Sequence, residues 1–151
     1  MFKKILFATD FSDTAKRAYD ALKKIRVECG AQKVVLVHII DEREVDSLAN
    51  FEGFYSVQLD NIRKEVADQM TKKAEQELES YKTELRNLGY QVEIRIFEGI
   101  PYDEIVNVAN KENVSLIVMG SNGKGIIQEL FIGSTSDKVI RQAKCPVLIV
   151  R

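Results

Sequence analysis

Apolar and polar residues follow two patterns that alternate along the chain. Continuous apolar runs occupy residues 5–8, 34–40, 116–119 and 147–150. Runs of this length predict strands that are covered on both faces, as in a parallel sheet. Residues 92–96 instead alternate between apolar and charged side chains, which predicts a strand with one more polar face.

Segments with helical spacing separate these strands. The spacing predicts helices after Ser12, over residues 60–88, after Pro101 and near residues 134–143. Ser12 is a suitable N-cap and Pro101 a suitable first-turn residue, and Gly30 is a typical helix stop. Each predicted strand is therefore joined to the next by a predicted helix.

Residues 42–60 and the last predicted helix are described separately. Residues 42–60 lack a clear period, and we interpret them as a loop or a partly helical segment. The last helix is expected to bury Ile132, Val139 and Ile140. Residues 134–137, Ser-Thr-Ser-Asp, resemble a capping box with Asp in place of Glu.

The resulting order, β-α-β-α-β-α-β-α-β, predicts an α/β fold with a five-stranded parallel sheet and helices on both faces. No linker, repeat or low-complexity tract divides residues 1–151, so one domain is expected. Ligands of such sheets bind beyond the carboxyl ends of the strands, where the strand order reverses. The order 3-2-1-4-5 brings the polar loops after the first and fourth strands together. A flavodoxin-like order would put the less polar residues 98–101 there, so we predict 3-2-1-4-5.

Charge and composition restrict the function. Lys and Arg number 22 against 23 Asp and Glu, which gives a net charge of −1. There is no basic field to attract nucleic acid or anionic lipid. No run reaches the roughly 20 apolar residues of a membrane span, and the N-terminal apolar run is too short for a signal peptide. Neither a nucleic-acid partner nor a membrane is expected, and the expected location is cytoplasmic.

The strongest candidate for chemistry is the segment that joins the fourth strand to the last helix. Gly120, Gly123 and Gly125 open this segment, and Gly133 closes it before three consecutive hydroxyl residues. Glycines allow backbone N–H groups to turn inward, and the N-terminus of the following helix attracts anions. The segment therefore predicts a cradle for phosphate.

The glycine spacing is neither that of a Walker A loop nor that of a Rossmann fingerprint. It reads Gly120-x-x-Gly123, nine residues, and then Gly133-Ser134. With this spacing the chain resembles the universal stress protein family, in its ATP-binding branch. Residues 5–12, 35–41 and 145–150 resemble the family's opening strand and acidic loop, its second strand and its closing strand. The resemblance implies a Rossmann-like fold over nearly the whole chain.

The resemblance also implies a role for individual residues. Thr9 and Asp10 would lie near the nucleoside, with Asp10 on the ribose hydroxyls or on a metal-bound water. Ile39 would meet adenine through its backbone, and Ala8, where close relatives often have proline, would offer its backbone carbonyl. The ribose and the phosphates, with Mg²⁺ or Mn²⁺ on the phosphates, would lie against Gly120, Ser121, Asn122, Gly123, Lys124, Gly125, Gly133, Ser134, Thr135 and Ser136.

Some of these residues also have a purely structural interpretation. Asp10 can cap the first helix together with Ser12, and Lys124 can be a solvated side chain. His38, the single histidine, is more typical of a hydrogen-bonded core residue than of a catalytic group.

The favoured hypothesis is an ATP-binding sensor or switch with little or no intrinsic hydrolysis and an unknown downstream protein partner. Efficient phosphoryl transfer needs a base or positioned water, charged clamps and a well-held metal. The loop offers Lys124, Asp10 and, as a candidate base, Glu129, but no arginine. The alternatives are a slow or partner-activated ATPase, a nucleotidyl transferase and a ligand-free dimeric interaction module. A phosphoacceptor receiver domain would need clustered acidic residues beside Asp10 and a lysine after the last strand.

The last strand also predicts an assembly. Residues 147–150 would form the edge of the sheet, where unpaired backbone groups favour pairing with another strand. The resemblance implies a homodimer through this strand.

Overall fold

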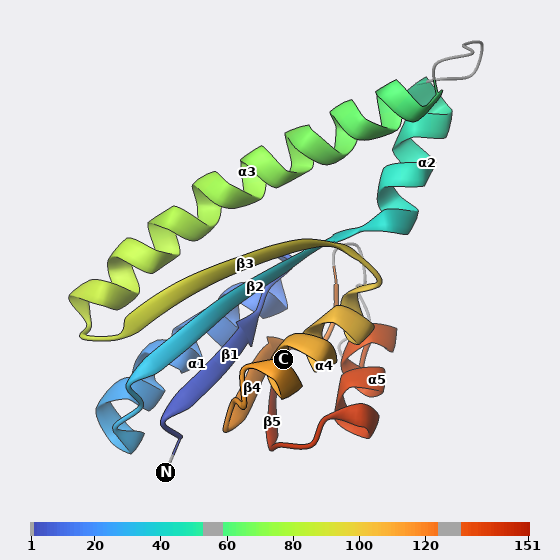
Figure 1. The fold of residues 1–151 in the computed structure, drawn as a ribbon. Helices are drawn as coiled ribbons and strands as arrows, with labels where there is room; N and C mark the ends of the chain where they lie inside the picture. The colour runs from blue at the N-terminus through green and yellow to red at the C-terminus, as the bar shows by residue number, and fades with distance from the viewer. Residues whose placement is uncertain (1, 53–58, 124–130) are drawn as a thin grey trace.

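Five parallel strands form a single sheet between two layers of helices (Figure 1). The computed structural model describes residues 2–52, 59–123 and 131–151. The strands are β1 (Lys4–Ala8), β2 (Lys33–Asp41), β3 (Gln91–Gly99), β4 (Leu116–Gly120) and β5 (Val147–Val150). The helices are α1 (Asp13–Cys29), α2 (Glu42–Glu52), α3 (Leu59–Asn87), α4 (Pro101–Lys111) and α5 (Ser134–Gln142).

The strand order is β3-β2-β1-β4-β5, which confirms the predicted order. The order reverses beside β1, because β1 pairs with both β2 and β4. Ala8, at the carboxyl end of β1, is level with Val37 of β2 and Met119 of β4. The loops that follow β1 and β4 therefore leave the sheet side by side.

Alternate residues of the central strands divide the interior into two cores. Ile5 and Phe7 of β1 pack with buried side chains of α1 and α3. Leu6 and Ala8 point to the opposite face and pack with side chains of α4 and α5. Because β1 and β2 are buried on both faces, their sequences are continuously apolar, as the pattern of residues predicted.

The predicted helix boundaries are largely confirmed. Ser12 caps α1, with its side-chain oxygen accepting a hydrogen bond from the Ala15 N–H (3.3 Å), and Gly30 ends the helix at φ +65°. Pro101 is the first residue of α4. The long helix predicted over residues 60–88 is α3. Within residues 42–60, α2 forms a helix over Glu42–Glu52, so the segment is partly helical as far as the structure describes it.

Two expectations about the last helix are wrong. Ile132 and Ile140 are 48% and 43% exposed, and only Val139 of the three apolar residues is buried. α5 is short and packs on α4 and β5 along a narrow side, which leaves the neighbouring apolar positions open to solvent. The capping box is also absent, because the N-cap of α5 is Gly133, which has no side chain to donate or accept.

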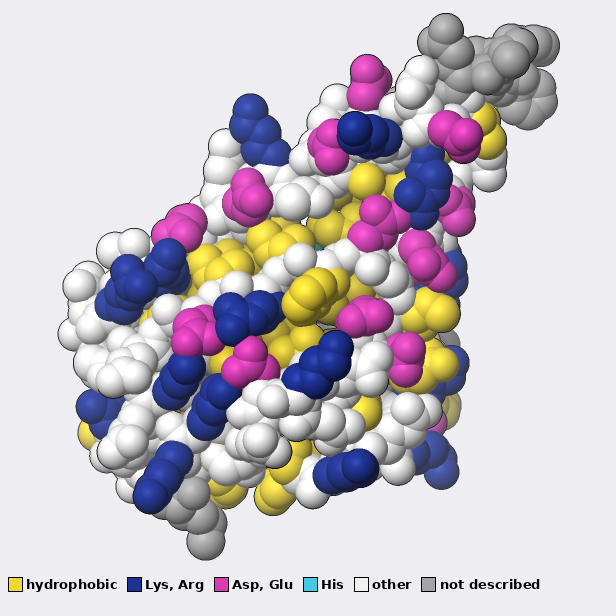
Figure 2. Space-filling model, viewed as in Figure 1, with side chains coloured by type: hydrophobic (Ala, Val, Ile, Leu, Met, Phe, Trp, Pro, Cys, Tyr) yellow, Lys and Arg dark blue, Asp and Glu magenta, His cyan; other side chains and the backbone are white. Residues whose placement is uncertain are grey.

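Charged side chains of both signs are interspersed over the face of the molecule seen in Figure 2. Part of this pattern is a chain of ion pairs across the sheet, which runs from Lys33 through Glu93, Arg95 and Glu112 to Lys4. Among the described helices, none has the length and apolar character required to cross a bilayer.

Candidate functional site

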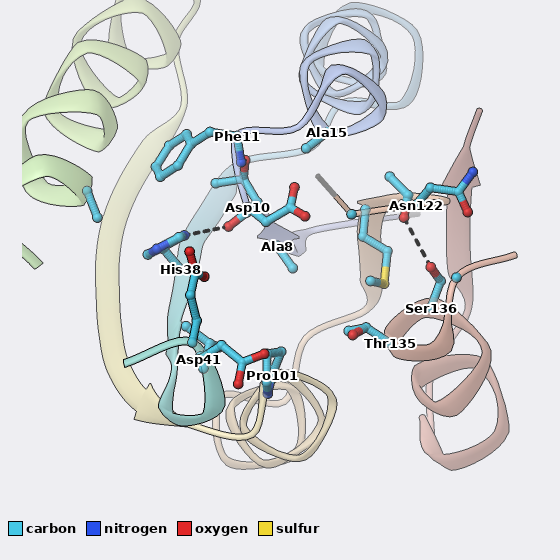
Figure 3. Close-up of a pocket in the computed structure, with 18 of the residues that line it drawn as sticks. Ala8, Asp10, Phe11, Ala15, His38, Asp41, Pro101, Asn122, Thr135 and Ser136 are labelled. Atoms are coloured by element: carbon cyan, nitrogen blue, oxygen red, sulfur yellow. Dashed lines mark hydrogen bonds between the residues drawn. The ribbon is translucent and has the colours of Figure 1, made fainter. Parts of the chain in front are cut away.

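A cavity of about 490 Å³ opens at the carboxyl ends of β1, β2 and β4, where the strand order reverses (Figure 3). This is the position predicted from the two polar loops. Eleven of the predicted site residues line it: Ala8, Thr9, Asp10, Ile39, Gly120, Asn122, Gly123, Gly133, Ser134, Thr135 and Ser136. Lys124, Gly125 and the candidate base Glu129 lie outside the described residues.

The turn after β1 fixes the direction of Asp10. Thr9 is buried and donates its N–H to the carbonyl oxygen of Val37 (3.0 Å), which keeps the strand end in the sheet. One Asp10 carboxylate oxygen accepts a hydrogen bond from the Ser12 N–H (3.0 Å). The other oxygen, Oδ2, faces the glycine loop, since a Cβ placed on Gly123 would lie 3.1 Å from it. Asp10 therefore shapes the turn with one oxygen and presents the other to the pocket.

The first turn of α1 holds the loop after β4 in place. A Cβ on Gly120 would lie 2.5 Å from Thr14 Oγ1 and 2.6 Å from the Ala15 nitrogen. Ser12 and Thr14 donate their hydroxyls to the carbonyl oxygen of Asn122, at 3.1 and 2.6 Å. Because α1 approaches so closely, only glycine fits at the end of β4, and the two polar loops are joined directly.

The end of the loop is tied to its beginning by Ser121. The Gly133 N–H and the Ser136 hydroxyl both donate to the Ser121 carbonyl oxygen, each at 2.7 Å. A Cβ on Gly133 would lie 3.0 Å from the same oxygen. Ser121 also donates its own N–H to the carbonyl of Val150 (2.8 Å). This arrangement brings the start of α5 to the pocket and attaches it to the sheet.

The three hydroxyls at the start of α5 differ in what they can offer a ligand. The first helical hydrogen bond is donated by Asp137 to Gly133 (2.9 Å), so the N–H groups of Ser134, Thr135 and Ser136 precede it and belong to the open first turn. Ser136 is 2% exposed and its hydroxyl already donates to the backbone. Ser134 is exposed and Thr135 half-buried, and both line the cavity. Such a turn suits an oxyanion.

One wall of the cavity was missed by the sequence reasoning. It is formed by α3, from which Met70, Lys73, Ala74 and Glu77 line the pocket. These residues have the spacing of one helix face, and the same spacing describes the core stripe of the helix. In the sequence, Lys73 and Glu77 stand directly beside this stripe, and nothing in the pattern separates them from solvated charges. Further lining residues that were not predicted as ligands are Phe11, Ala15, His38, Asp41, Glu44, Pro101 and Met119.

His38 is hydrogen-bonded, as expected, and it also lines the cavity. Its Nδ1 hydrogen-bonds the carbonyl oxygen of Thr9 (2.8 Å), and its ring lies 4.8 Å from that of Phe11 between centroids. The residue is half-buried and also lines the cavity. The prediction of a hydrogen-bonded histidine is confirmed, but the residue stands at the pocket wall rather than deep in the core.

The described part of the lining is acidic. It contains four carboxylates, from Asp10, Asp41, Glu44 and Glu77, against a single Lys or Arg side chain, Lys73. The side-chain hydrogen bonds from Arg43, at 2.9 and 2.6 Å, lower the pKa of Asp41 and keep it ionised. A phosphate ligand would therefore require an accompanying cation to offset this charge.

No group of three or more His, Cys, Asp or Glu in the described residues is arranged to hold a metal ion. A divalent ion in this pocket would have to take most of its ligands from phosphate oxygens and water, with fewer than three from such side chains of the described residues. Mg²⁺ is commonly bound in this way, through one or two carboxylates and substrate phosphates.

Comparison with known proteins gives a consistent result. The model of the Universal stress protein family matches residues 1–151. Universal stress protein MJ0577 of Methanocaldococcus jannaschii is 37% identical over 156 residues, which cover 100% of this chain and 96% of that protein. Universal stress protein YxiE of Bacillus subtilis is 38% identical over 154 residues and is covered completely, as is this chain.

Solved structures have the same fold. The structure of MJ0577 matches with a TM-score of 0.83 and 39% identity, over 99% of this chain and 96% of that chain. A universal stress protein from Archaeoglobus fulgidus, solved in complex with dAMP, matches with a TM-score of 0.61 and 21% identity, over 100% of this chain and 98% of that chain.

Proposed function

The chain belongs to the universal stress protein family, and from this premise we propose that its pocket binds ATP as the input of a regulatory switch. The observation that carries the proposal is the convergence of two groups at one cavity. Asp10 presents its second carboxylate oxygen toward Gly123, and the open first turn of α5 begins beside the same loop. A nucleotide needs both a hydroxyl-binding acid and an anion-binding turn.

The ligand groups would be divided between the two sides of the pocket. Asp10 accepts hydrogen bonds from the ribose hydroxyls, and the backbone of Ile39 contacts the adenine. Ser134 and Thr135 donate their N–H and hydroxyl groups to the phosphates. Ser136 acts differently, because its buried hydroxyl holds the loop rather than the ligand. The phosphates carry Mg²⁺ or Mn²⁺, which offsets the acidic lining.

A switch fits this site better than an efficient ATPase. Among the described lining residues, the cationic side chain is Lys73 of α3, and no arginine lines the cavity. Fast phosphoryl transfer relies on positive groups that stabilise the charge of the transition state. We therefore propose that the chain alone hydrolyses ATP slowly or not at all, and that a downstream protein responds to the bound state.

The test begins with what the purified protein carries. The protein is denatured and any released nucleotide is identified by chromatography, alongside Gly133→Val. The wild type is expected to release ATP near one per chain, or, if it is purified empty, to bind Mg²⁺-ATP in calorimetry. Gly133→Val is expected to lose binding, because a Cβ there would lie 3.0 Å from Ser121 O and displace the start of α5.

Gly99→Val is the matched control for this variant. A Cβ on Gly99 would also meet an atom at 3.0 Å, but that atom belongs to the Glu104 side chain, and neither Gly99 nor Glu104 lines the cavity. The control should bind ATP as the wild type does, and circular dichroism should show that both variants are folded. A wild type that neither releases nucleotide nor gives heat or a thermal shift with Mg²⁺-ATP would refute the proposal and favour the ligand-free module.

Two further measurements define the ligand. Repeating the titration with EDTA in place of Mg²⁺ should weaken ATP binding, because the uncompensated phosphates would face four carboxylates. A competition titration with dAMP and AMP asks whether the phosphate chain matters. Displacement of ATP at equal affinity by a monophosphate would mean that the second and third phosphates do not contribute to binding.

A homodimer through β5 is the proposed assembly. β5 pairs with β4 on one side and forms the edge of the sheet on the other. Its Leu148 is 37% exposed, and edge strands with apolar side chains favour pairing with a second strand. Pairing of this kind would bring the β5 strands of two copies of the chain together.

A further inference from the structure

Phe11 lies between the pocket and the helical hairpin formed by α2 and α3, and we propose that it is the positioning residue that couples the two. In this proposal, nucleotide binding changes how firmly α3 is held against the sheet. The inference rests on the proposed function, because it concerns what the bound nucleotide does to the rest of the molecule.

The backbone at Phe11 has an unusual conformation. Its φ is +62°, in the left-handed region that residues with a Cβ rarely adopt. Two hydrogen bonds hold the turn: Phe11 N–H to Thr9 Oγ1 and Ser12 N–H to Asp10 Oδ1, each at 3.0 Å. Backbone strain of this kind is often retained at functional sites. Here it aims two adjacent side chains in different directions.

Figure 3 shows these directions. Asp10 points into the middle of the cavity, whereas the ring of Phe11 points toward the green helix, which is α3. The ring lies 4.8 Å from the His38 ring and 6.2 Å from the ring of Tyr81, which belongs to α3. If a ligand bound to Asp10 and shifted this turn, the ring of Phe11, which packs on α3, would therefore move with it.

Phe11 is also shared between two hydrophobic clusters. It packs against the main core beneath α1 and α3. It packs equally against the smaller cluster that attaches the hairpin to the end of β2, whose buried members are Ile40, Val45, Val66, Ala67 and Ala74. Ile96 of β3 is likewise shared, but it does not line the cavity. Of these two shared side chains, Phe11 is the one in contact with the pocket.

The wall of α3 completes the connection. Ala74 is buried in the small cluster, Met70 packs against it, and both also line the cavity. Among the described residues, ion pairs of Arg63 with Asp46 (2.7 Å) and Glu98 (2.5 Å) also hold this part of the hairpin. Exposed pairs contribute little. Apolar packing in the small cluster, to which Phe11 contributes, is therefore the stronger attachment of the first half of α3.

The alternative is that Phe11 only fills space. In that case its truncation would lower stability but leave the response of α3 to nucleotide unchanged. Hydrogen–deuterium exchange of the full chain, with and without saturating Mg²⁺-ATP, separates the two interpretations. In the wild type, ATP is expected to change exchange in residues 62–74 by at least about fivefold, the lower end of typical coupling between sites.

Three substitutions at Phe11 are compared. Phe11→Ala and Phe11→Gly both remove the ring; Gly adopts the positive φ without strain, whereas Ala keeps the cost that Phe has there. Both should bind ATP and lose the response of residues 62–74, with Phe11→Gly keeping the higher affinity. Phe11→Leu retains apolar bulk and is expected to keep part of the response. Ile25→Ala, which truncates another half-buried side chain on the main core, should keep all of it.

The outcomes are distinguishable from those of the proposed function. A wild type that binds no ATP in calorimetry overturns both proposals. A wild type that binds ATP without any change in residues 62–74, or a Phe11→Ala variant with the wild-type response, overturns only the coupling. If Phe11→Ala does not fold, Met70→Ala provides the same test from the helix side, since it leaves the turn intact.

Discussion

At Gly120 the backbone of β4 passes so close to α1 that a side chain has no room. The atoms nearest to a Cβ placed there are backbone and hydroxyl atoms of Thr14 and Ala15, at 2.5 to 2.7 Å. Gly120 is thus required by the packing of α1, which allows the two loops to meet. Gly123, whose nearest neighbour would be the far end of the Asp10 side chain, is required less strictly.

Gly120→Ala is therefore expected to lower the free energy of unfolding by about 2–3 kcal/mol, as overpacking does in a dense interior. Gly30→Ala is the comparison, because nothing lies within 4 Å of its Cβ but its φ is +65°. It should cost only about 1 kcal/mol from backbone strain. Urea denaturation of both variants measures the difference. Equal losses would mean that α1 can move away from β4.

The hydroxyls at the start of α5 lead to a second prediction at this scale. Ser136→Ala removes a buried hydrogen bond to Ser121 O (2.7 Å) and should lower stability by about 1 kcal/mol. Ser134→Ala removes an exposed hydroxyl and should leave stability unchanged, while weakening ATP binding about tenfold through a lost bond to a charged group. Denaturation and calorimetry on both variants test this division. A Ser134→Ala variant with unchanged affinity would place the phosphates elsewhere.

Among the elements, α4 is attached to the sheet by charge as well as by its apolar face. Glu112, at the C-terminal end of α4, accepts hydrogen bonds from Lys4 of β1 (2.5 Å) and Arg95 of β3 (2.9 Å). The bond from Lys4 is the main cause that lowers the pKa of Glu112 from its ordinary value of 4.5. Arg95 continues the chain of ion pairs to Glu93.

This pKa shift predicts a pH dependence of stability. A carboxyl group with a lowered pKa in the folded state stabilises the fold above its unfolded value of 4.5, and this contribution is lost as the pH falls through the folded pKa. Glu112→Gln should lower stability by about 0.5–1 kcal/mol at pH 7 and should converge toward the wild type in acid. Urea denaturation at pH 7 and below pH 4.5 measures both. A constant difference at all pH values would contradict the assignment to charge.

The hairpin of α2 and α3 adds a wall to the pocket, which is otherwise formed by residues at the carboxyl ends of the strands and by the start of α5. In Figure 1 it extends beyond the sheet, and the pocket is bounded on that side by residues of α3. Its attachment depends on a small cluster that includes Phe11. The hairpin is thus the part of the fold best placed to respond to the ligand.

On the scale of the whole molecule, β5 leaves one sheet edge unpaired by the described chain. Leu148→Lys puts a charge on this edge and is expected to convert the proposed dimer to a monomer. Leu88→Lys is the control, because Leu88 is similarly exposed, at 42% against 37%, but lies after α3 at the other side of the sheet. Sedimentation velocity separates the two states. A wild type that is already monomeric would refute the dimer, and an unchanged mass for Leu148→Lys would move the interface away from β5.

The sequence by itself determined the five strands, their order in the sheet and the family, but it left open the extra helix α2. Strands buried on both faces require continuous apolar runs, such as residues 34–40. Polar loops after two strands can form one ligand site only when those strands are neighbours, which predicts the strand order. The spacing of Gly120, Gly123 and Gly133 can be recognised in the sequence, although Gly120 and Gly133 are required by the close approach of α1 and of the Ser121 carbonyl. The strand order and the family are confirmed.

Only the tertiary structure decided which surfaces meet. α3 became a pocket wall because it packs on β3 and β2 and passes the pocket with Met70 and Ala74. A stripe of such residues looks the same in sequence whether it faces a core or a cavity. Ile140 proved exposed because α5 has few partners. The roles of Ser134 and Ser136 separated because one hydroxyl reached a carbonyl of a distant strand end. Contacts between segments far apart in the chain depend on the whole packing, which no local pattern contains.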